Sequence, residues 1–204
     1  SAGLHIRLFE EVKAVEKTGN SFNIITVKQQ YQAANVIVCT GFYDIPYLLN
    51  VPGEELPKVK HYYDDPHYYA FQKVLVVGAA NSAVDAALET WRKGATVTMI
   101  VRGDAISERV KYWVKPDVEN RIKEGSIKAY FNASVAAIRP TEVDIQTHDG
   151  LVTIENDWVL AMTGYQPNLQ FLRGMGIQLA DDEVCSPAYN EDTYETNVQG
   201  IYLA

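Results

Sequence analysis

Residues 74–102 read VLVVGAANSAVDAALETWRKGATVTMIVR. The stretch begins with an apolar, valine-rich run, passes through a glycine turn and an alanine-rich run at helical spacing, and closes with a second β-branched run. This order predicts a strand, a tight turn, a helix and a second parallel strand, which together form a βαβ unit. Helical spacing places Ala83, Ala87 and Trp91 on one stripe, where small side chains allow close packing on a sheet. We therefore expect an α/β protein with a Rossmann-like domain.

The turn of this unit predicts a dinucleotide site. In such a fold the first turn carries little side-chain bulk, so backbone N–H groups can reach a pyrophosphate at the positive end of the following helix. Gly78, Ala80 and Ala83 occupy the three fingerprint positions, and Ala80 adds a methyl group where a glycine is expected. Asn81 and Ser82 suit a helix start and can donate to phosphate. The alternative is a βαβ scaffold without a ligand, but the order of strand, turn, helix and second strand favours nucleotide binding.

The end of the second strand favours NADPH over NADH. An acidic residue there would bind the ribose 2′-hydroxyl of NAD, whereas this chain has Arg102. A guanidinium can bind a 2′-phosphate through two parallel hydrogen bonds, and it stays charged at every relevant pH. Arg109 and Lys111 follow soon after and are further candidates for the same phosphate. The alternative for both is a solvated helix face.

Composition limits the possible partners. The chain has 204 residues, 47% of them apolar, and a formal net charge of -8. A globular protein with this charge repels nucleic acid and anionic membranes, so we expect neither as a partner. No apolar run approaches the roughly 20 residues that span a bilayer, and the N-terminus lacks a secretory signal. We therefore expect a cytoplasmic protein.

Turn signals and apolar patterns divide the chain into four segments. Residues 4–38 alternate apolar and polar residues and predict a β-meander, and residues 42–72, with several prolines, predict a connection between domains. Beyond the βαβ unit we expect a helix with Pro116 in its first turn, then short strands with a hairpin turn at Asp149-Gly150. The predicted segments are 1–45, the end of a strand-rich lobe; 46–72, a linker; 73–164, the nucleotide-binding domain; and 165–204, a return to the first lobe.

A repeated pattern indicates two related lobes. Each predicted meander ends in an apolar strand that runs into Thr-Gly, as VIVCTG at 36–41 and WVLAMTG at 158–164. In the first of these strands Cys39 is expected to be a small buried residue.

No catalytic acid, base or nucleophile can be identified. The segment HYYDDPH at 61–67 contains potential metal ligands, but their spacing matches no metal motif, and a loop over a flat ligand or an interface is the favoured interpretation. Cys39 and Cys185 are too far apart in the sequence for a Cys-x-x-Cys redox pair. We therefore expect no metal, and the catalytic residues stay unassigned.

Taken together, these features resemble the flavin-dependent, NADPH-using disulfide reductases of the thioredoxin-reductase superfamily. Within it the chain is most similar to the bacillithiol disulfide reductase (YpdA) family. The resemblance covers essentially the whole chain and rests on the two Thr-Gly strand ends and four further stretches. These are VGAANSAVDAALE at 77–89, VKYWVKPDVENRI at 110–122, GYQPN at 164–168 and NVQGIYLA at 197–204.

The resemblance implies roles for specific residues. In that family NADPH gives a hydride to FAD, and the reduced flavin passes electrons towards a low-molecular-weight disulfide. By position, the pyrophosphate would lie against Gly78, Ala79, Ala80, Asn81, Ser82 and Ala83. Arg102 and Arg109 would bind the 2′-phosphate. Thr40-Gly41 and Thr163-Gly164 would mark the strands that cross between the NADPH and FAD lobes.

The chain differs from the family pattern at both ends. Family members begin with a Gly-x-Gly-x-x-Gly turn for FAD, and nothing similar precedes residue 4 here. They also continue beyond a strand end like Leu203-Ala204 into a Gly-Asp pair at the flavin. The chain therefore resembles an internal fragment, with a complete NADPH lobe flanked by partial FAD-domain strands. The absence of Cys-x-x-Cys argues against thioredoxin as the direct substrate.

Three functions remain open. The first is the NADPH half of a flavin oxidoreductase acting on a small disulfide, and such proteins tend to form homodimers. The second is a flavin monooxygenase-like enzyme. The third is an NADPH-binding module that is not catalytic by itself, because hydride transfer requires a flavin held at contact distance from the nicotinamide.

Overall fold

The computed structural model describes residues 3, 5–181 and 185–204 and divides the chain into two compact units. One unit contains residues 1–45 and 166–204, and the other is the continuous stretch Pro46–Tyr165. β5 (Ile45–Pro46) and β14 (Tyr165–Gln166) pair with each other at the two points where the chain passes from one unit to the other. None of the helices in this described part is long and apolar enough to span a bilayer.

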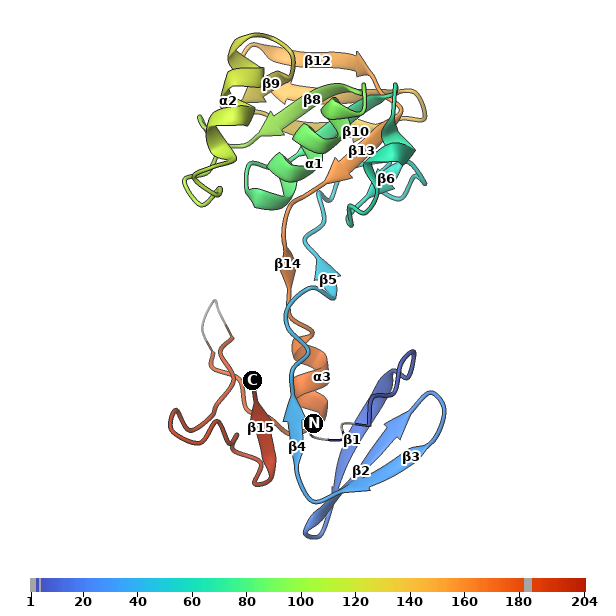
Figure 1. The fold of residues 1–204 in the computed structure, drawn as a ribbon, viewed down its shortest axis with the longest axis vertical. Helices are drawn as coiled ribbons and strands as arrows, with labels where there is room; N and C mark the ends of the chain where they lie inside the picture. Colours follow the sequence, from blue (N-terminus) through green and yellow to red (C-terminus); the bar gives the residue numbers. More distant parts are fainter. Residues whose placement is uncertain (1–2, 4, 182–184) are drawn as a thin grey trace. The chain divides into compact units, whose positions relative to one another are not determined.

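The unit Pro46–Tyr165 is built on a parallel sheet with the strand order β6-β13-β7-β8-β9 (Figure 1). Its strands are β6 (Val59–Lys60), β7 (Lys73–Val77), β8 (Thr96–Val101), β9 (Lys128–Phe131) and β13 (Trp158–Ala161). Between β7 and β8 the chain forms α1 (Asn81–Arg92), as the alanine-rich run predicts. The predicted Rossmann-like α/β fold is therefore confirmed.

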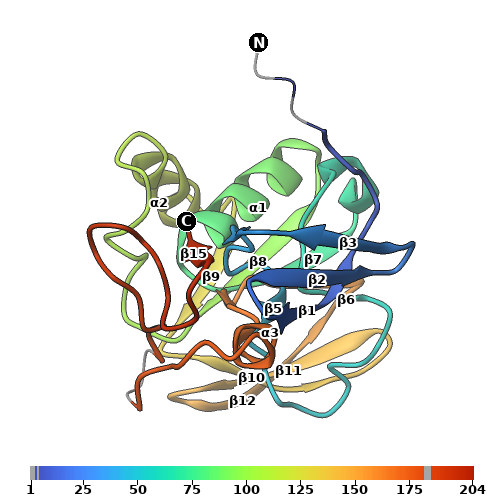
Figure 2. The ribbon, with the colours of Figure 1, turned by 90° about the horizontal axis from the view of Figure 1, so that it is seen from below.

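Two hydrophobic layers cover the opposite faces of this sheet. On one face Val74 and Val76 of β7 pack with the alanines of α1, and α2 (Lys115–Lys123) lies beside α1. On the other face Leu75 and Val77 pack against an antiparallel sheet of β10 (Ser134–Ile138), β11 (Glu142–Thr147) and β12 (Gly150–Glu155). Figure 2 shows α1 and this antiparallel sheet on opposite sides of the parallel strands. Every second residue of β7 faces each layer, so β7 is buried on both faces.

The stretch 46–72 is not the linker that its prolines predict. It contains β6, which pairs with β13, and η1 (Pro66–Tyr69). Val59 is buried, and the half-buried Leu49 and Leu56 pack against the same core. The prolines do mark turns, but the apolar residues between them complete the core of the unit. The sequence predicted that this stretch lies outside the domain, because a strand of two residues is too short to show the alternation of apolar and polar residues that indicates a strand.

The other unit contains a meander of β1 (Val12–Thr18), β2 (Ser21–Thr26) and β3 (Gln30–Ala33), as predicted. β4 (Val36–Val38) follows and pairs in parallel with β15 (Ile201–Leu203). α3 (Leu169–Gly174), which the sequence did not predict, begins after Asn168, whose side chain accepts a hydrogen bond from the N–H of Phe171. A helix of six residues is too short to show the apolar period that predicts helices.

The structure also tests the predictions for α2, for the hairpin between β11 and β12, and for Cys39. α2 has a proline in its first turn and ends close to Gly125, as expected. The hairpin between β11 and β12 turns at His148-Asp149, one residue earlier than expected, because Gly150 already pairs with Thr147. Cys39 is exposed rather than buried, so its prediction was wrong. It follows β4 instead of lying within the strand.

Candidate nucleotide site

The turn after β7 requires glycine at position 78. Gly78 has a φ of +135°, and a Cβ atom there would lie 2.5 Å from the carbonyl oxygen of Met162. Its N–H donates to the carbonyl of Ile100 in β8 at 3.0 Å. The turn is therefore pinned between β8 and the end of β13, with no room for a side chain.

The first turn of α1 presents backbone N–H groups without a side-chain cap. Ala80 is the N-cap residue and has no side chain that can accept from the helix, so the first N–H groups of the helix lack an internal acceptor. Ala79 is half-buried and Ala80 is exposed, whereas Ala83 is fully buried against the sheet. Ser82 is half-buried in the same turn. Oriented N–H groups at a helix N-terminus fit an anionic group such as a pyrophosphate.

The side chain of Asn81 joins this turn to the segment that follows β8. Its Nδ2 donates to the carbonyl of Arg109 at 3.0 Å, and its Oδ1 accepts from the N–H of Lys111 at 3.0 Å. The N–H of Ser107 also donates to the carbonyl of Ala79 at 3.0 Å. The sequence predicted that Asn81 contacts the phosphate. In the structure the carboxamide of Asn81 instead binds the backbone of Arg109 and Lys111.

Basic side chains follow β8 at the same edge of the sheet. Arg102 comes directly after the strand and is exposed, and Arg109 is also exposed. Neither guanidinium forms an ion pair with any residue in the described part of the chain. Lys111 differs, because its Nζ lies 3.3 Å from a carboxylate oxygen of Asp85. Carboxyl ends of parallel strands meet at one edge, so Arg102 and Gly78 lie at the edge where ligands bind in open α/β sheets.

Thr163 and Gly164 follow the end of β13 at this edge, because β13 pairs with β7 in parallel. The Thr163 hydroxyl donates to the carbonyl of Tyr47, and the N–H of Tyr47 donates to the carbonyl of Gly164 at 3.0 Å. Thr40 and Gly41 occupy the corresponding place in the other unit, after β4, and both are exposed.

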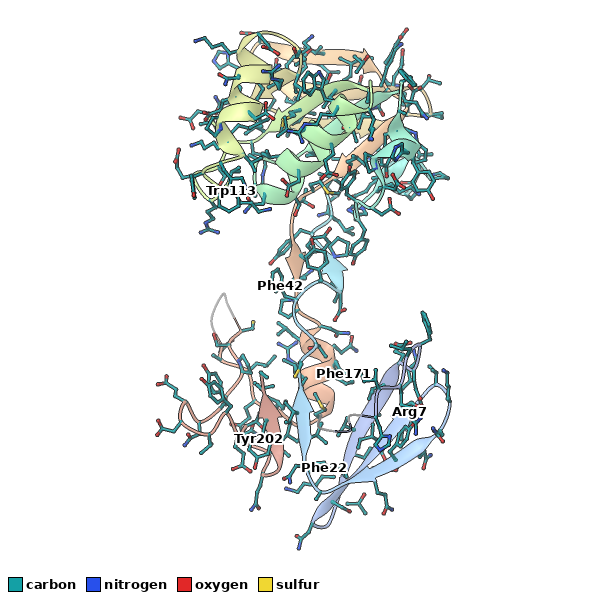
Figure 3. The ribbon with its side chains drawn as sticks, viewed as in Figure 1. Arg7, Phe22, Phe42, Trp113, Phe171 and Tyr202 are labelled. Atoms are coloured by element: carbon teal, nitrogen blue, oxygen red, sulfur yellow. The ribbon has the colours of Figure 1, made fainter. Side chains whose placement is uncertain are left out.

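A cavity in the unit of residues 1–45 and 166–204 was not expected from the sequence. It has a volume of about 630 Å³ and lies between β1, β4 and α3, with Val12, Ile37, Cys39, Thr40 and Phe171 in its wall. Figure 3 shows Phe171 projecting from α3. The described residues of this unit contain one α-helix, α3, and it follows Asn168 rather than a glycine-rich turn.

An exposed aromatic pair also lies beside the basic segment. Tyr112 is 82% exposed and Trp113 65%, and their rings meet edge to face with centroids 4.9 Å apart. Figure 3 shows Trp113 at the border of its unit. The sequence shows that two aromatic residues directly follow Lys111. It does not show that they are exposed, because their exposure depends on where the segment lies in the fold.

The segment HYYDDPH has structural partners. Asp65 accepts from the backbone N–H of His67 at 2.9 Å and from its ring, and these bonds lower the pKa of the Asp65 carboxyl. His61 lies 3.5 Å from Glu54 instead. Among the described residues no three His, Cys, Asp or Glu side chains are grouped to hold a metal ion.

Comparison with known proteins places the chain in a family. The model of the family described as pyridine nucleotide-disulphide oxidoreductase matches residues 1–204. The bacilliredoxin reductase Bdr of Bacillus subtilis (strain 168) is 44% identical over 186 residues, which cover 91% of this chain and 57% of that protein.

Solved structures agree with this match. The bacillithiol disulfide reductase Bdr (YpdA) from Staphylococcus aureus superposes with a TM-score of 0.94 at 40% identity, covering 98% of this chain and 62% of that one. The thioredoxin reductase of T. acidophilum superposes with a TM-score of 0.76 at 26% identity, covering 96% of this chain and 64% of that one. The chain thus spans about three fifths of the length of these relatives. It belongs to the pyridine nucleotide-disulphide oxidoreductase family, with a thioredoxin reductase-like fold.

Proposed function

We propose that the chain is the NADPH-binding portion of an FAD-dependent oxidoreductase that reduces a low-molecular-weight disulfide. When bound, NADPH supplies a hydride, and a flavin held by the longer protein accepts it. The single observation that carries the proposal is the uncapped start of α1 at the sheet edge where Arg102 follows β8, with no ion pair between its guanidinium and any described residue. The chain's own residues bind and orient the nucleotide.

The charge at the sheet edge supports NADPH rather than NADH as the donor. A 2′-phosphate adds a dianionic group to the nucleotide, and Arg102 and Arg109 offer guanidiniums that no described carboxylate neutralises. Arg102, rather than an acid that would accept from a ribose 2′-hydroxyl, directly follows β8. The backbone N–H groups from Ala79 to Ala83 serve the pyrophosphate, which both nucleotides share.

The names of two relatives indicate the class of electron acceptor. The Staphylococcus aureus relative is called a bacillithiol disulfide reductase and the Bacillus subtilis relative a bacilliredoxin reductase. A small disulfide and a small disulfide-bearing protein are therefore the two acceptors to compare. The family favours disulfide reduction over the monooxygenase alternative.

For the isolated chain we propose nucleotide binding without turnover. Unit 1–45 and 166–204 lacks, among its described residues, the glycine-rich turn that a flavin pyrophosphate requires. We also propose that Thr40-Gly41 and Thr163-Gly164 mark the strands that cross between the nucleotide and flavin lobes. A cytoplasmic location and a homodimer are part of the same proposal.

The test uses the longer protein that contains this chain, loaded with FAD. NADPH is expected to bleach the flavin absorbance faster than NADH, and bacillithiol disulfide or bacilliredoxin is expected to restore it under anaerobic conditions. Oxygen-dependent restoration with peroxide release, and none with either disulfide, would favour the monooxygenase instead. A protein that retains no flavin and oxidises no NADPH would refute the proposal.

A further inference from the structure

We propose that Asn81 is a positioning residue that sets the preference for the 2′-phosphate. Its carboxamide holds residues 109–111, and therefore the side chains of Arg109 and Lys111, against the turn that binds the pyrophosphate. This inference rests on the proposed NADPH site and assigns Asn81 a role other than contact with phosphate.

The hydrogen bonds of Asn81 match the two faces of a carboxamide. The Nδ2 donor meets the carbonyl of Arg109 and the Oδ1 acceptor meets the N–H of Lys111, each at 3.0 Å. One planar side chain thus binds backbone groups two residues apart, on either side of Val110. Only a side chain with both a donor and an acceptor at this length can make both bonds.

The segment that Asn81 holds alternates between the core and the solvent. Ile106 and Val110 are both 4% exposed and belong to the core that packs on α1. Arg109 and Lys111, on either side of Val110, are exposed. The buried residues fix where the segment lies, and the Asn81 bonds fix its backbone next to the turn. The basic side chains therefore start from defined backbone positions.

This arrangement separates two parts of nucleotide binding. The pyrophosphate uses backbone N–H groups at the start of α1, and Asn81 contributes its own N–H there whatever its side chain. The 2′-phosphate needs basic side chains at a fixed distance from that turn. Loosening residues 109–111 should therefore weaken NADPH binding and leave NADH binding nearly unchanged.

The test compares three variants of the whole chain. Asn81→Ala removes both bonds, and Asn81→Ser keeps a short polar side chain at the helix start in case the alanine variant folds poorly. Asn120→Ala is the matched control, because Asn120 is an exposed asparagine on α2. Titration calorimetry measures the dissociation constants for NADPH and NADH.

We expect Asn81→Ala to lower the affinity for NADPH by about tenfold, the equivalent of one charge-assisted hydrogen bond. The affinity for NADH should change by less than about twofold, within the effect of a neutral surface change. In a chain that also carries Arg109→Ala and Lys111→Ala, the Asn81 substitution should have no further effect on the NADPH to NADH ratio. Equal losses for both nucleotides, or an unchanged ratio, would overturn the inference.

Hydrogen exchange of the nucleotide-free chain separates this inference from the proposed function. The N–H of Lys111 donates to Asn81, so it should exchange faster in Asn81→Ala and at the original rate in Asn120→Ala. An unchanged exchange rate would refute the holding role directly. Failure of the unaltered chain to bind either nucleotide would instead refute the proposed function.

Discussion

Two strands of similar sequence, β4 and β13, occupy different environments in the two units. Each follows a three-stranded antiparallel sheet and each runs into Thr-Gly. β13 lies between β6 and β7, and its residues Val159 and Leu160 are fully buried. β4 pairs with β15 in the described part of the chain, and Ile37 is 67% exposed. Val38 of β4 is buried, so the two strands differ in whether their second face is covered, and neighbouring strands rather than the local sequence decide this.

The largest expected effect is a difference in stability between the two strands. Leu160→Ala should lower the free energy of unfolding of its unit by about 2–5 kcal/mol, because it leaves a cavity in a closed core. Ile37→Ala should change that of the other unit by no more than about 0.5 kcal/mol, because the side chain is mostly in solvent. Urea denaturation measures both changes, and tryptophan fluorescence reports on the unit Pro46–Tyr165, which contains all 3 tryptophans. Equal losses in the two variants would contradict the comparison.

A second difference between the two units concerns the glycines near the ends of β13 and β4. Gly78→Ala should cost about 3 kcal/mol, because it combines a positive φ with a contact at 2.5 Å to a backbone oxygen, and it should also abolish NADPH binding. Gly41→Ala should cost about 1 kcal/mol, since nothing lies within 4 Å of the added Cβ and only its positive φ opposes alanine. Thermal denaturation of the two variants measures the difference. A Gly78→Ala chain as stable as the unaltered one would show that the turn can move away from Met162.

The basic residues at the sheet edge provide a smaller effect. Arg102→Ala should weaken NADPH binding by about tenfold or more and leave NADH binding nearly unchanged, because one charge-assisted contact is lost. Lys111→Ala is the matched control and should have a smaller effect, because Asp85 already partly neutralises that charge. Titration calorimetry with both nucleotides gives the two ratios. An unchanged ratio for Arg102→Ala would show that the assignment of the 2′-phosphate to this side chain is wrong.

The smallest expected effect is a change in how stability depends on pH. Hydrogen bonds from Arg139 and then Thr153 lower the pKa of Asp144 from 3.8 to about 2. Since the folded state holds the ionised carboxylate, its contribution to stability is complete above pH 3.8 and is lost as the pH falls towards about 2. Asp144→Asn should therefore flatten the loss of stability of its unit over that range.

The control for this prediction lies in the other unit. Glu10 has a pKa lowered chiefly by the Thr26 hydroxyl, without an ion pair of the Arg139 kind. Glu10→Gln should leave the acid sensitivity of the unit Pro46–Tyr165 unchanged. Acid titrations followed by tryptophan fluorescence compare the two variants. A similar response in both would indicate that the Arg139 pair does not matter.

The βαβ unit was predictable from the sequence because its information is local. Apolar runs on β7 and β8 and the alanines of α1 each span enough residues to show a period. The short elements were not predictable, since β6 has two residues and is defined by its pairing with β13. Cys39 was misassigned because burial depends on neighbouring strands that are distant in the sequence.

The candidate site was predictable in part for the same reason. Gly78 and Arg102 follow directly from their places at the ends of two predicted strands. The connection from Asn81 to Arg109 and Lys111 spans 28 and 30 positions, and no local pattern indicates it. The close approach of Met162 to Gly78 likewise depends on the pairing of β13 with β7.

The most direct test of the account is titration calorimetry of the chain with NADPH and with NADH at one ionic strength. We expect NADPH to bind at least about tenfold more tightly, because only its 2′-phosphate can reach the guanidiniums of Arg102 and Arg109. Equal affinities for the two nucleotides, or binding of neither, would contradict it.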